Sequence, residues 1–245
     1  DTSRAEARAA LERIVSSMVS ASPNLNAQVE VKAADVLRAW VSARNARIKI
    51  ELSPVFRGAL APPVEMEVHA QVQEALGYAT MQVLQTPDLY GGKICAALDR
   101  QHPRDLFDVH LLLRDSGLTR DVFEAFLVYL ISSSRPIAEL LQPNWKDISD
   151  VFEEQFRGMT REPISLDALL EAREALRARI AQLITNDDKQ FLLSVKQGDP
   201  EWDLLPIANV SELPAVRWKL QNIRRMPKDR HLAAIGKLER VLAHL

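Results

Sequence analysis

Alternation of apolar and polar residues is confined to the part of the chain before Leu84, and this restriction constrains the fold more than any other feature. Between Asp35 and Leu52, apolar side chains recur at every second position on both sides of a polar turn at 43–45. This pattern predicts an antiparallel hairpin. Two further short strands are predicted at 64–68 and 80–84, and prolines separate them from the hairpin.

Helical periodicity lies on both sides of this segment. An amphipathic helix is predicted at 4–19, and the pattern after Leu84 is helical to the end of the chain. Thr86 followed by Pro87 is typical of a helix start, and Pro103 begins the next helix in the same manner. The later helices are predicted at 121–131, 145–156, 165–184, 187–195, 213–223 and 228–244.

Strands followed by helices indicate an α+β fold, with a mixed sheet and flanking helices before a C-terminal helical bundle. We expect the boundary near Asp115, because period-two alternation has ended well before it. The predicted parts are therefore a sheet-containing core at 1–115 and a helical domain at 116–245.

Composition narrows the classes of function. The formal net charge of −2 gives no whole-molecule attraction for nucleic acid, so any such surface must be local. Cys95 is the only cysteine, which excludes a disulfide framework or a thiolate zinc site within one chain. We find no apolar run of membrane-spanning length and no basic-then-apolar leader. A cytoplasmic protein without a membrane partner is expected.

The strand at 47–52 presents an acid and a base on one face. Lys49 and Glu51 alternate with Ile48, Ile50 and Leu52, so the charged pair lies opposite the apolar set. Two interpretations are open at this point: a reactive face, or a solvated face with an ion pair.

A second charged segment follows two adjacent glycines, Gly91 and Gly92, early in a predicted helix. Each glycine costs about 1 kcal/mol relative to alanine there, which suggests that a ligand or a strand approaches the backbone. Lys93 would project from this turn. Further on, both signs of charge gather at Arg100, Arg104, Asp105 and Asp108. The structural alternative is a salt-bridged helix junction in which Arg104 pairs with Asp108 one turn later.

These residues resemble the third motif of the AbiEii/AbiGii-type nucleotidyltransferases. The matching runs are Gly91-Gly92-Lys93, Ala96-Ala97-Leu98-Asp99-Arg100 and His102-Pro103-Arg104-Asp105-Leu106-Phe107-Asp108. Similar to the second motif are Ile48-Lys49-Ile50-Glu51, Ser53-Pro54 and Arg57-Gly58. The C-terminal signature of the family resembles Phe191-Leu192-Leu193-Ser194, Gly198-Asp199-Pro200-Glu201-Trp202 and the run from Leu213 to Asn222. The segments occur in the order that the family has.

The resemblance implies a polymerase-β-like nucleotidyltransferase core followed by a helical domain, acting as a toxin in a type IV toxin–antitoxin or phage-defence system. Glu51, Lys93 and Asp108 are then the expected catalytic residues. Substrate binding is expected from Lys49, Arg100, Arg104 and Asp105. Glu51 is also an expected ligand of Mg²⁺, and the main metal ligands, an Asp-x-Asp strand after a glycine-rich turn, are expected upstream of Asp1.

The partners implied are a nucleoside triphosphate as substrate, an RNA acceptor such as the 3′ end of a tRNA, and a cognate antitoxin protein. The alternative is a non-catalytic nucleotide- or protein-binding module that retains the fold. One segment suits RNA phosphates: six cations lie between Arg217 and Arg230 with a single acid, Asp229. Trp202 and Trp218 fit a stacking role or, as is more common for tryptophan in an apolar helical pattern, a place in the core.

Overall fold

The computed structural model of the protein describes residues 4–22, 24–31, 37–44, 46–52 and 58–245. The chain divides into two compact units, Asp1–Phe56 and Arg57–Leu245. The predicted division at residue 115 falls within the second unit, where helices from both sides of it pack together. The division into a core at 1–115 and a helical domain at 116–245 stays a prediction.

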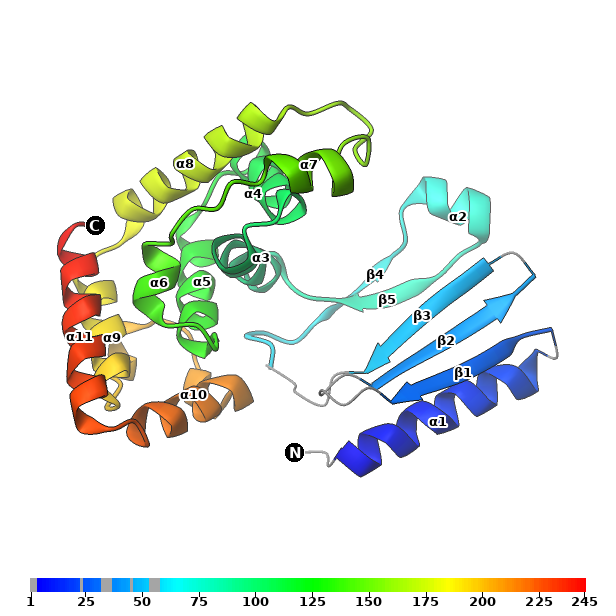
Figure 1. Ribbon diagram of the computed structural model, residues 1–245, viewed down its shortest axis with the longest axis horizontal. Helices are drawn as coiled ribbons and strands as arrows, with labels where there is room; N and C mark the ends of the chain where they lie inside the picture. The colour runs from blue at the N-terminus through cyan, green and yellow to red at the C-terminus, as the bar shows by residue number, and fades with distance from the viewer. Residues whose placement is uncertain (1–3, 23, 32–36, 45, 53–57) are drawn as a thin grey trace. The chain divides into compact units, whose positions relative to one another are not determined.

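The first unit is a three-stranded antiparallel sheet with one helix on it (Figure 1). Helix α1 (Arg4–Ala21) precedes β1 (Asn26–Val31), β2 (Leu37–Ala43) and β3 (Ala46–Leu52). The predicted hairpin is confirmed as β2 and β3, while β1 was not predicted. Leu11 and Val15 of α1 are buried against Ala39, so the helix covers one face of the sheet.

The second unit begins with a small strand–helix–strand element. β4 (Val64–Glu67) pairs antiparallel with β5 (Thr80–Val83), and helix α2 (Ala70–Leu76) joins them. Both strands were predicted, and α2 was not. Every strand pair of the described residues is antiparallel, and the strands form two small sheets where the sequence predicted a mixed one. Parallel neighbours need a long crossover, whereas a tight turn joins β2 to β3 and one short helix joins β4 to β5.

Helices form the rest of the second unit. None of the residues after Val83 forms a strand, and all of them are described, so the predicted α+β order is confirmed. The helices are α3 (Thr86–Arg100), α4 (Pro103–Asp115), α5 (Arg120–Ser132), α6 (Ile137–Leu141), α7 (Ser149–Gln155), α8 (Leu166–Leu183), α9 (Asn186–Gln197), α10 (Pro214–Arg224) and α11 (Lys228–Ala243), with short 3-10 turns at Trp202–Leu204 and Val210–Glu212.

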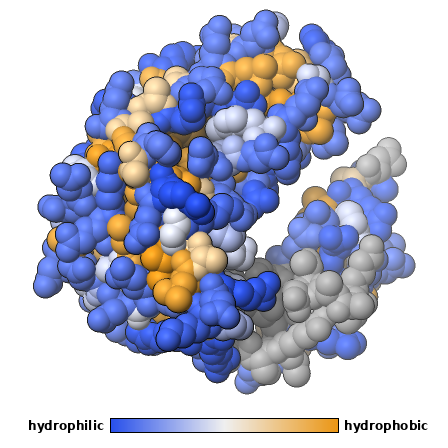
Figure 2. Space-filling model, turned by 60° about the vertical axis from the view of Figure 1, so that its left-hand side comes forward, coloured by the Kyte–Doolittle hydropathy of each residue, from blue (hydrophilic) through white to orange (hydrophobic). Residues whose placement is uncertain are grey.

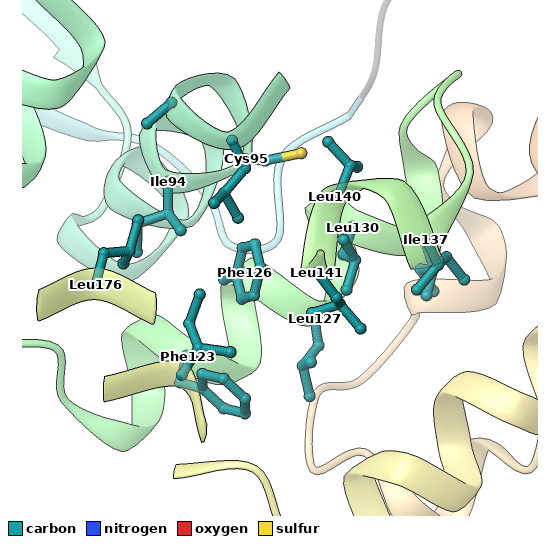
Figure 3. Close-up of a cluster of buried hydrophobic side chains, with 14 of the residues drawn as sticks. Ile94, Cys95, Phe123, Phe126, Leu127, Leu130, Ile137, Leu140, Leu141 and Leu176 are labelled. Carbon is teal, nitrogen blue, oxygen red and sulfur yellow. The ribbon is translucent and has the colours of Figure 1, made fainter. Parts of the chain in front are cut away.

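Helix α5 lies at the centre of the helical core. Its Phe123 and Phe126 are fully buried, and Figure 3 shows them among apolar side chains from α3, α6 and α8. Hydrophilic side chains cover most of the face shown in Figure 2, with smaller apolar patches between them. In the described part of the chain, no helix is both long and apolar enough to cross a membrane.

Candidate functional site

Lys93 and Asp108 meet although fifteen positions separate them in the sequence. Lys93 is in the second turn of α3 and Asp108 is in the second turn of α4. The Nζ atom of Lys93 donates to Oδ2 of Asp108 at 2.6 Å, and about a third of each side chain remains exposed. The ion pair is therefore open to solvent and within reach of an anionic ligand.

The junction between α3 and α4 fixes the geometry of this pair. Helix α3 ends at Gln101, which adopts a left-handed conformation, and its side chain binds the backbone of Asn144 and Lys146. His102 then caps α4, because its Nδ1 accepts from the backbone N–H of Arg104. Local capping and one long-range contact together set the angle between the helices.

The other predicted charges of this segment divide into one buried acid and two exposed cations. Arg100 donates to Oδ1 of Asp105 at 2.5 Å, and Asp105 is 8% exposed. Oδ2 of Asp105 is also buried and has no hydrogen-bond partner among the described residues. Arg104 is exposed and forms no ion pair with any described residue, and Asp108 pairs with Lys93, so the alternative pairing of Arg104 with Asp108 is wrong. Asp105 turns inward and supports the junction.

The two glycines before Lys93 have a packing explanation. A Cβ atom on Gly91 would lie 2.8 Å from backbone atoms of Ala125 and Phe126 in α5. A Cβ atom on Gly92 would lie 3.1 Å from the ring of Tyr129. The close approach inferred from the sequence is real, but the approaching group is helix α5 rather than a ligand or a strand.

A buried acid next to these glycines was not predicted. Asp88 is 1% exposed, and its Oδ1 accepts from the hydroxyl of Tyr129 at 2.6 Å. Its Oδ2 accepts from the backbone N–H of Leu60 at 2.9 Å. Asp88 therefore joins the start of α3 to α5 and to the segment before β4. An acid directly after Thr86 and Pro87 was the available signal, since acids are favoured in the first turn of a helix.

Glu51 lies on the face of the first unit's sheet that α1 does not cover. Its Oε1 accepts from Arg38, with N–O distances of 2.9 and 2.7 Å, and its Oε2 lies 3.3 Å from Nζ of Lys49. The hydrogen bond from Arg38 is the main reason that the pKa of Glu51 lies below its usual value. The ion pair between Lys49 and Glu51 was one of the two interpretations open from the sequence.

Arg38 is a residue that the sequence argument missed, although a signal for it exists. Arg38 stands directly opposite Glu51 in the antiparallel register of β2 and β3. The short turn between Ala43 and Ala46 fixes that register, so the pairing could have been counted outward from the turn. Ser53, Pro54 and Arg57 of the second motif lie outside the described residues.

The described residues do not by themselves form a metal site. They contain no group of three or more His, Cys, Asp or Glu side chains that could hold an ion. Both carboxylate oxygens of Glu51 contact cations. The metal-binding role of Glu51 remains a prediction, and so does its convergence with Lys93 and Asp108, which belong to the other unit.

The C-terminal basic segment differs from the sequence interpretation at two neighbouring residues. Trp218 is 51% exposed, whereas the core was the favoured place for it. Lys219 is 8% exposed and donates to the backbone carbonyls of Ser133 and Arg135 at 2.5 and 2.8 Å. Burial, reinforced by the charge of Lys196, lowers the pKa of Lys219 to about 8. Trp202 is partly buried against Phe191, as expected for a core residue.

Comparison with protein families gives one match. Residues 1–222 match the model of the family described as "Nucleotidyl transferase AbiEii toxin, Type IV TA system". Neither the curated proteins nor the solved structures include a match to the chain.

Proposed function

The chain belongs to the AbiEii family of nucleotidyl transferase toxins from type IV toxin–antitoxin systems, and we propose that it transfers a nucleotide from a nucleoside triphosphate to an RNA acceptor. The 3′ end of a tRNA is the acceptor that we propose first. Membership of a type IV system also implies a cognate antitoxin. We place the protein in the cytoplasm, where its nucleotide and RNA substrates are found.

The observation that carries the proposal is the ion pair of Lys93 and Asp108, about a third of which is exposed. Nucleotidyl transfer depends on positioning and on neutralising phosphate charge. The ammonium of Lys93 is a compact point charge suited to a triphosphate, and Asp108 holds it in place in the absence of substrate. A phosphate oxygen can then replace Asp108 as the partner of Lys93. The exposed Arg104 and Arg100 supply further positive charge on the same two helices.

Glu51 is the carboxylate that we assign to the acceptor hydroxyl. Its lowered pKa keeps it ionised at neutral pH, and the flanking Arg38 and Lys49 hold both of its oxygens in fixed positions. An ionised, oriented carboxylate can accept the proton of an attacking hydroxyl. Mg²⁺ is the metal that the family resemblance implies, and Lys49 is the cation that would face a substrate phosphate beside Glu51.

A charge-reversal experiment separates catalysis from simple ion pairing. Lys93→Ala and Asp108→Asn should each abolish label transfer from an α-labelled nucleoside triphosphate to RNA, and should relieve toxicity in cells that express the complete gene. Lys93→Asp combined with Asp108→Lys restores the ion pair without restoring the cation's position. If pairing alone matters, this double variant will be active. If Lys93 contacts phosphate, it will stay inactive while melting like the wild type.

Lys237 provides the matched control. It forms a more exposed ion pair with Glu139, at 3.0 Å, on α11 and α6. Lys237→Ala should leave transfer and toxicity unchanged, since exposed pairs contribute at most about 1 kcal/mol. Lys93→Arg is the second companion, because a planar guanidinium replaces a point charge poorly. Full toxicity and undiminished label transfer in Lys93→Ala would refute the assignment, and a purified complete protein without any transfer activity would favour the non-catalytic binding module.

A further inference from the structure

Helix α10 carries an exposed stripe that combines an aromatic ring, two amides and two guanidinium groups. Its buried face consists of Ala215, Val216, Lys219, Leu220 and Ile223. The exposed stripe lies on the other face, where residues recur three and four positions apart. It consists of Pro214, Arg217, Trp218, Gln221, Asn222 and Arg225, and we call it the α10 stripe.

Trp218 is the residue on this stripe that most needs an explanation. Half of its surface is exposed, and a tryptophan ring in water forfeits a large hydrophobic gain. Lys219, the next residue in the sequence, is buried, whereas Arg217, Gln221 and Asn222 lie with Trp218 on the exposed side of the helix. A flat apolar ring flanked by hydrogen-bonding amides is complementary to a nucleobase, which offers a π-face and a polar edge.

The charge around Trp218 favours the same class of ligand. No acid lies on the α10 stripe, and Asp229 is the only acid between Leu213 and Arg230, although the chain as a whole carries a net charge of −2. Arg217 is the compensated cation of the stripe, because it pairs with Glu212 directly before this segment. Arg225, Lys228 and Arg230 are all exposed, and none of them forms an ion pair in the part of the chain that the structure describes. Such uncompensated cations near an aromatic platform are typical of surfaces that follow a phosphate backbone.

We propose that the α10 stripe binds unpaired nucleotides of the RNA acceptor, with a base stacked on Trp218 and a phosphate at Arg225. This inference rests on the proposed function for the identity of the RNA as acceptor. Trp218 lies within the residues that match the family, 1–222, whereas Arg225, Lys228 and Arg230 lie beyond them. An acidic protein segment or an anionic lipid surface would use the cations but would leave the exposed ring and amides unexplained.

The test measures binding of fluorescent RNA to the full chain in the absence of nucleotide. The probes are a single strand of about twelve nucleotides, a hairpin with a short unpaired 3′ tail, and the same hairpin with a blunt end. We expect the tailed hairpin to bind more tightly than the blunt one. Trp218→Ala should weaken binding of the single strand about tenfold without changing its salt dependence. Trp218→Phe should retain most of the affinity, because phenylalanine also stacks.

Arg225→Gln tests the phosphate contact separately. It should weaken binding several-fold and reduce the slope of log affinity against log salt by about 0.7, the value for one phosphate contact on a single strand. Two controls match these variants. Tyr78→Ala removes an aromatic side chain that is 68% exposed near Glu67, and Arg240→Gln removes an exposed cation at the other end of α11. Neither should change RNA binding.

The outcomes distinguish this surface from the proposed activity. Wild-type RNA affinity in both Trp218→Ala and Arg225→Gln overturns the inference. If these two variants bind RNA like the wild type but lose binding to polyglutamate or to phosphatidylserine vesicles, the inference is overturned in favour of a protein or lipid partner. Lys93→Ala should bind RNA normally. A protein that binds RNA through Trp218 but never transfers a nucleotide would support RNA binding by the α10 stripe and refute the proposed function. Undiminished transfer to RNA in Trp218→Ala would support the proposed function and refute the role of the stripe in binding the acceptor.

Discussion

Gly91 of α3 lies so close to α5 that a Cβ atom at this position would come within 2.8 Å of the carbonyl carbon of Ala125. Backbone atoms cannot rotate away as a side chain can, so only glycine allows this contact. The first turns of α3, and Lys93 with them, are held against the central helix of the core. The glycine pair of the motif therefore serves packing, and Lys93, the residue that we propose to be catalytic, follows it in the chain.

Gly91→Ala should destabilise the protein. The added methyl group gains helix propensity, about 1 kcal/mol, but forces α3 away from α5, and overpacking typically costs about 1 to 3 kcal/mol. Gly236→Ala in α11 is the matched control, because a Cβ atom there meets nothing within 4 Å. That variant should be more stable by up to about 1 kcal/mol. Urea unfolding of both variants measures the difference, and equal shifts in the same direction would contradict the packing explanation.

Substitution of Asp188 should lower the unfolding free energy more than substitution of most other acids in the chain. It is 1% exposed, caps α9 together with Thr185, and binds both terminal nitrogens of Arg120 at 2.7 Å. Asp188→Ala leaves the guanidinium of Arg120 without its main partner, and breaking such a pair costs about 3 to 5 kcal/mol. Asp187→Ala, at an exposed position of the same turn, should change the unfolding free energy by less than about 1 kcal/mol. Comparable losses in the two variants would show that Arg120 finds another partner.

The same ion pair of Asp188 and Arg120 predicts that stability depends on pH in the acidic range. Burial alone would raise the pKa of Asp188, but hydrogen bonds from Arg120 and Thr185 outweigh it and bring the pKa below its usual value. The unfolded chain therefore binds a proton more readily than the folded chain does. The contribution of Asp188 is complete above the ordinary aspartate pKa of 3.8 and is lost as the pH falls through the lower folded value. The stability difference between wild type and Asp188→Asn should shrink over that range.

Lys219 predicts a change of stability in the same direction, a rise with increasing pH, but in the alkaline range. Its folded pKa of about 8 lies below the ordinary value of 10.5, so the unfolded chain holds more protons between these two values. Unfolding free energy attributable to Lys219 should therefore rise with pH across that window, by up to about 3 kcal/mol. The neutral amine still has two N–H donors for the carbonyls of Ser133 and Arg135. Thermal or urea unfolding from pH 7 to 10.5 measures the trend.

Lys219→Met should remove this rise, whereas Lys237→Met, at an exposed position, should leave it unchanged. Lys196→Met provides a finer check, because the charge of Lys196 contributes to lowering the pKa of Lys219. Removing that charge should raise the folded pKa of Lys219, so the rise in unfolding free energy should begin at a higher pH. A wild type and a Lys219→Met variant with parallel pH profiles would show that the ammonium of Lys219 is not the titrating group.

Glu51→Gln should reduce nucleotide transfer by at least about a hundredfold with little effect on folding. Glutamine keeps the size of the side chain but cannot accept a proton from the acceptor hydroxyl. The ion pairs with Arg38 and Lys49 are exposed and contribute little to stability. Glu65→Gln, on the exposed strand β4, is the control and should retain activity. Transfer by Glu51→Gln at the wild-type rate would leave Glu51 as part of a surface ion-pair cluster.

The sequence predicts helix starts and turns best, because local stereochemistry determines where they occur. Pro87 and Pro103 marked the starts of α3 and α4, because a proline at the first turn loses no helical hydrogen bond. The turn between Ala43 and Ala46 identified the hairpin of β2 and β3. Strand β1 carried the same period-two signal in Ala27 and Val29, which face the core of the first unit, and it was overlooked.

Long-range contacts explain what the sequence could not predict. The helix predicted from Trp145 begins only at Ser149. Residues before it are held elsewhere, since Arg173 stacks on the ring of Trp145 and the side chain of Gln101 binds the backbone on both sides of it. The pairing of Lys93 with Asp108 instead of Arg104 with Asp108 likewise depends on the angle between two helices, which no local pattern encodes.

Helix α10 places a lysine inside and a tryptophan outside at adjacent positions, the reverse of what hydrophobicity alone would choose. Lys219 finds two carbonyl partners in only one rotational setting of the helix, and a turn of about 100° would exchange it for Trp218. The two carbonyls thus fix the same orientation that burial of Val216, Leu220 and Ile223 favours. In a redesign that replaced Lys219 with leucine, these apolar residues would have to keep the tryptophan ring facing outward without that help.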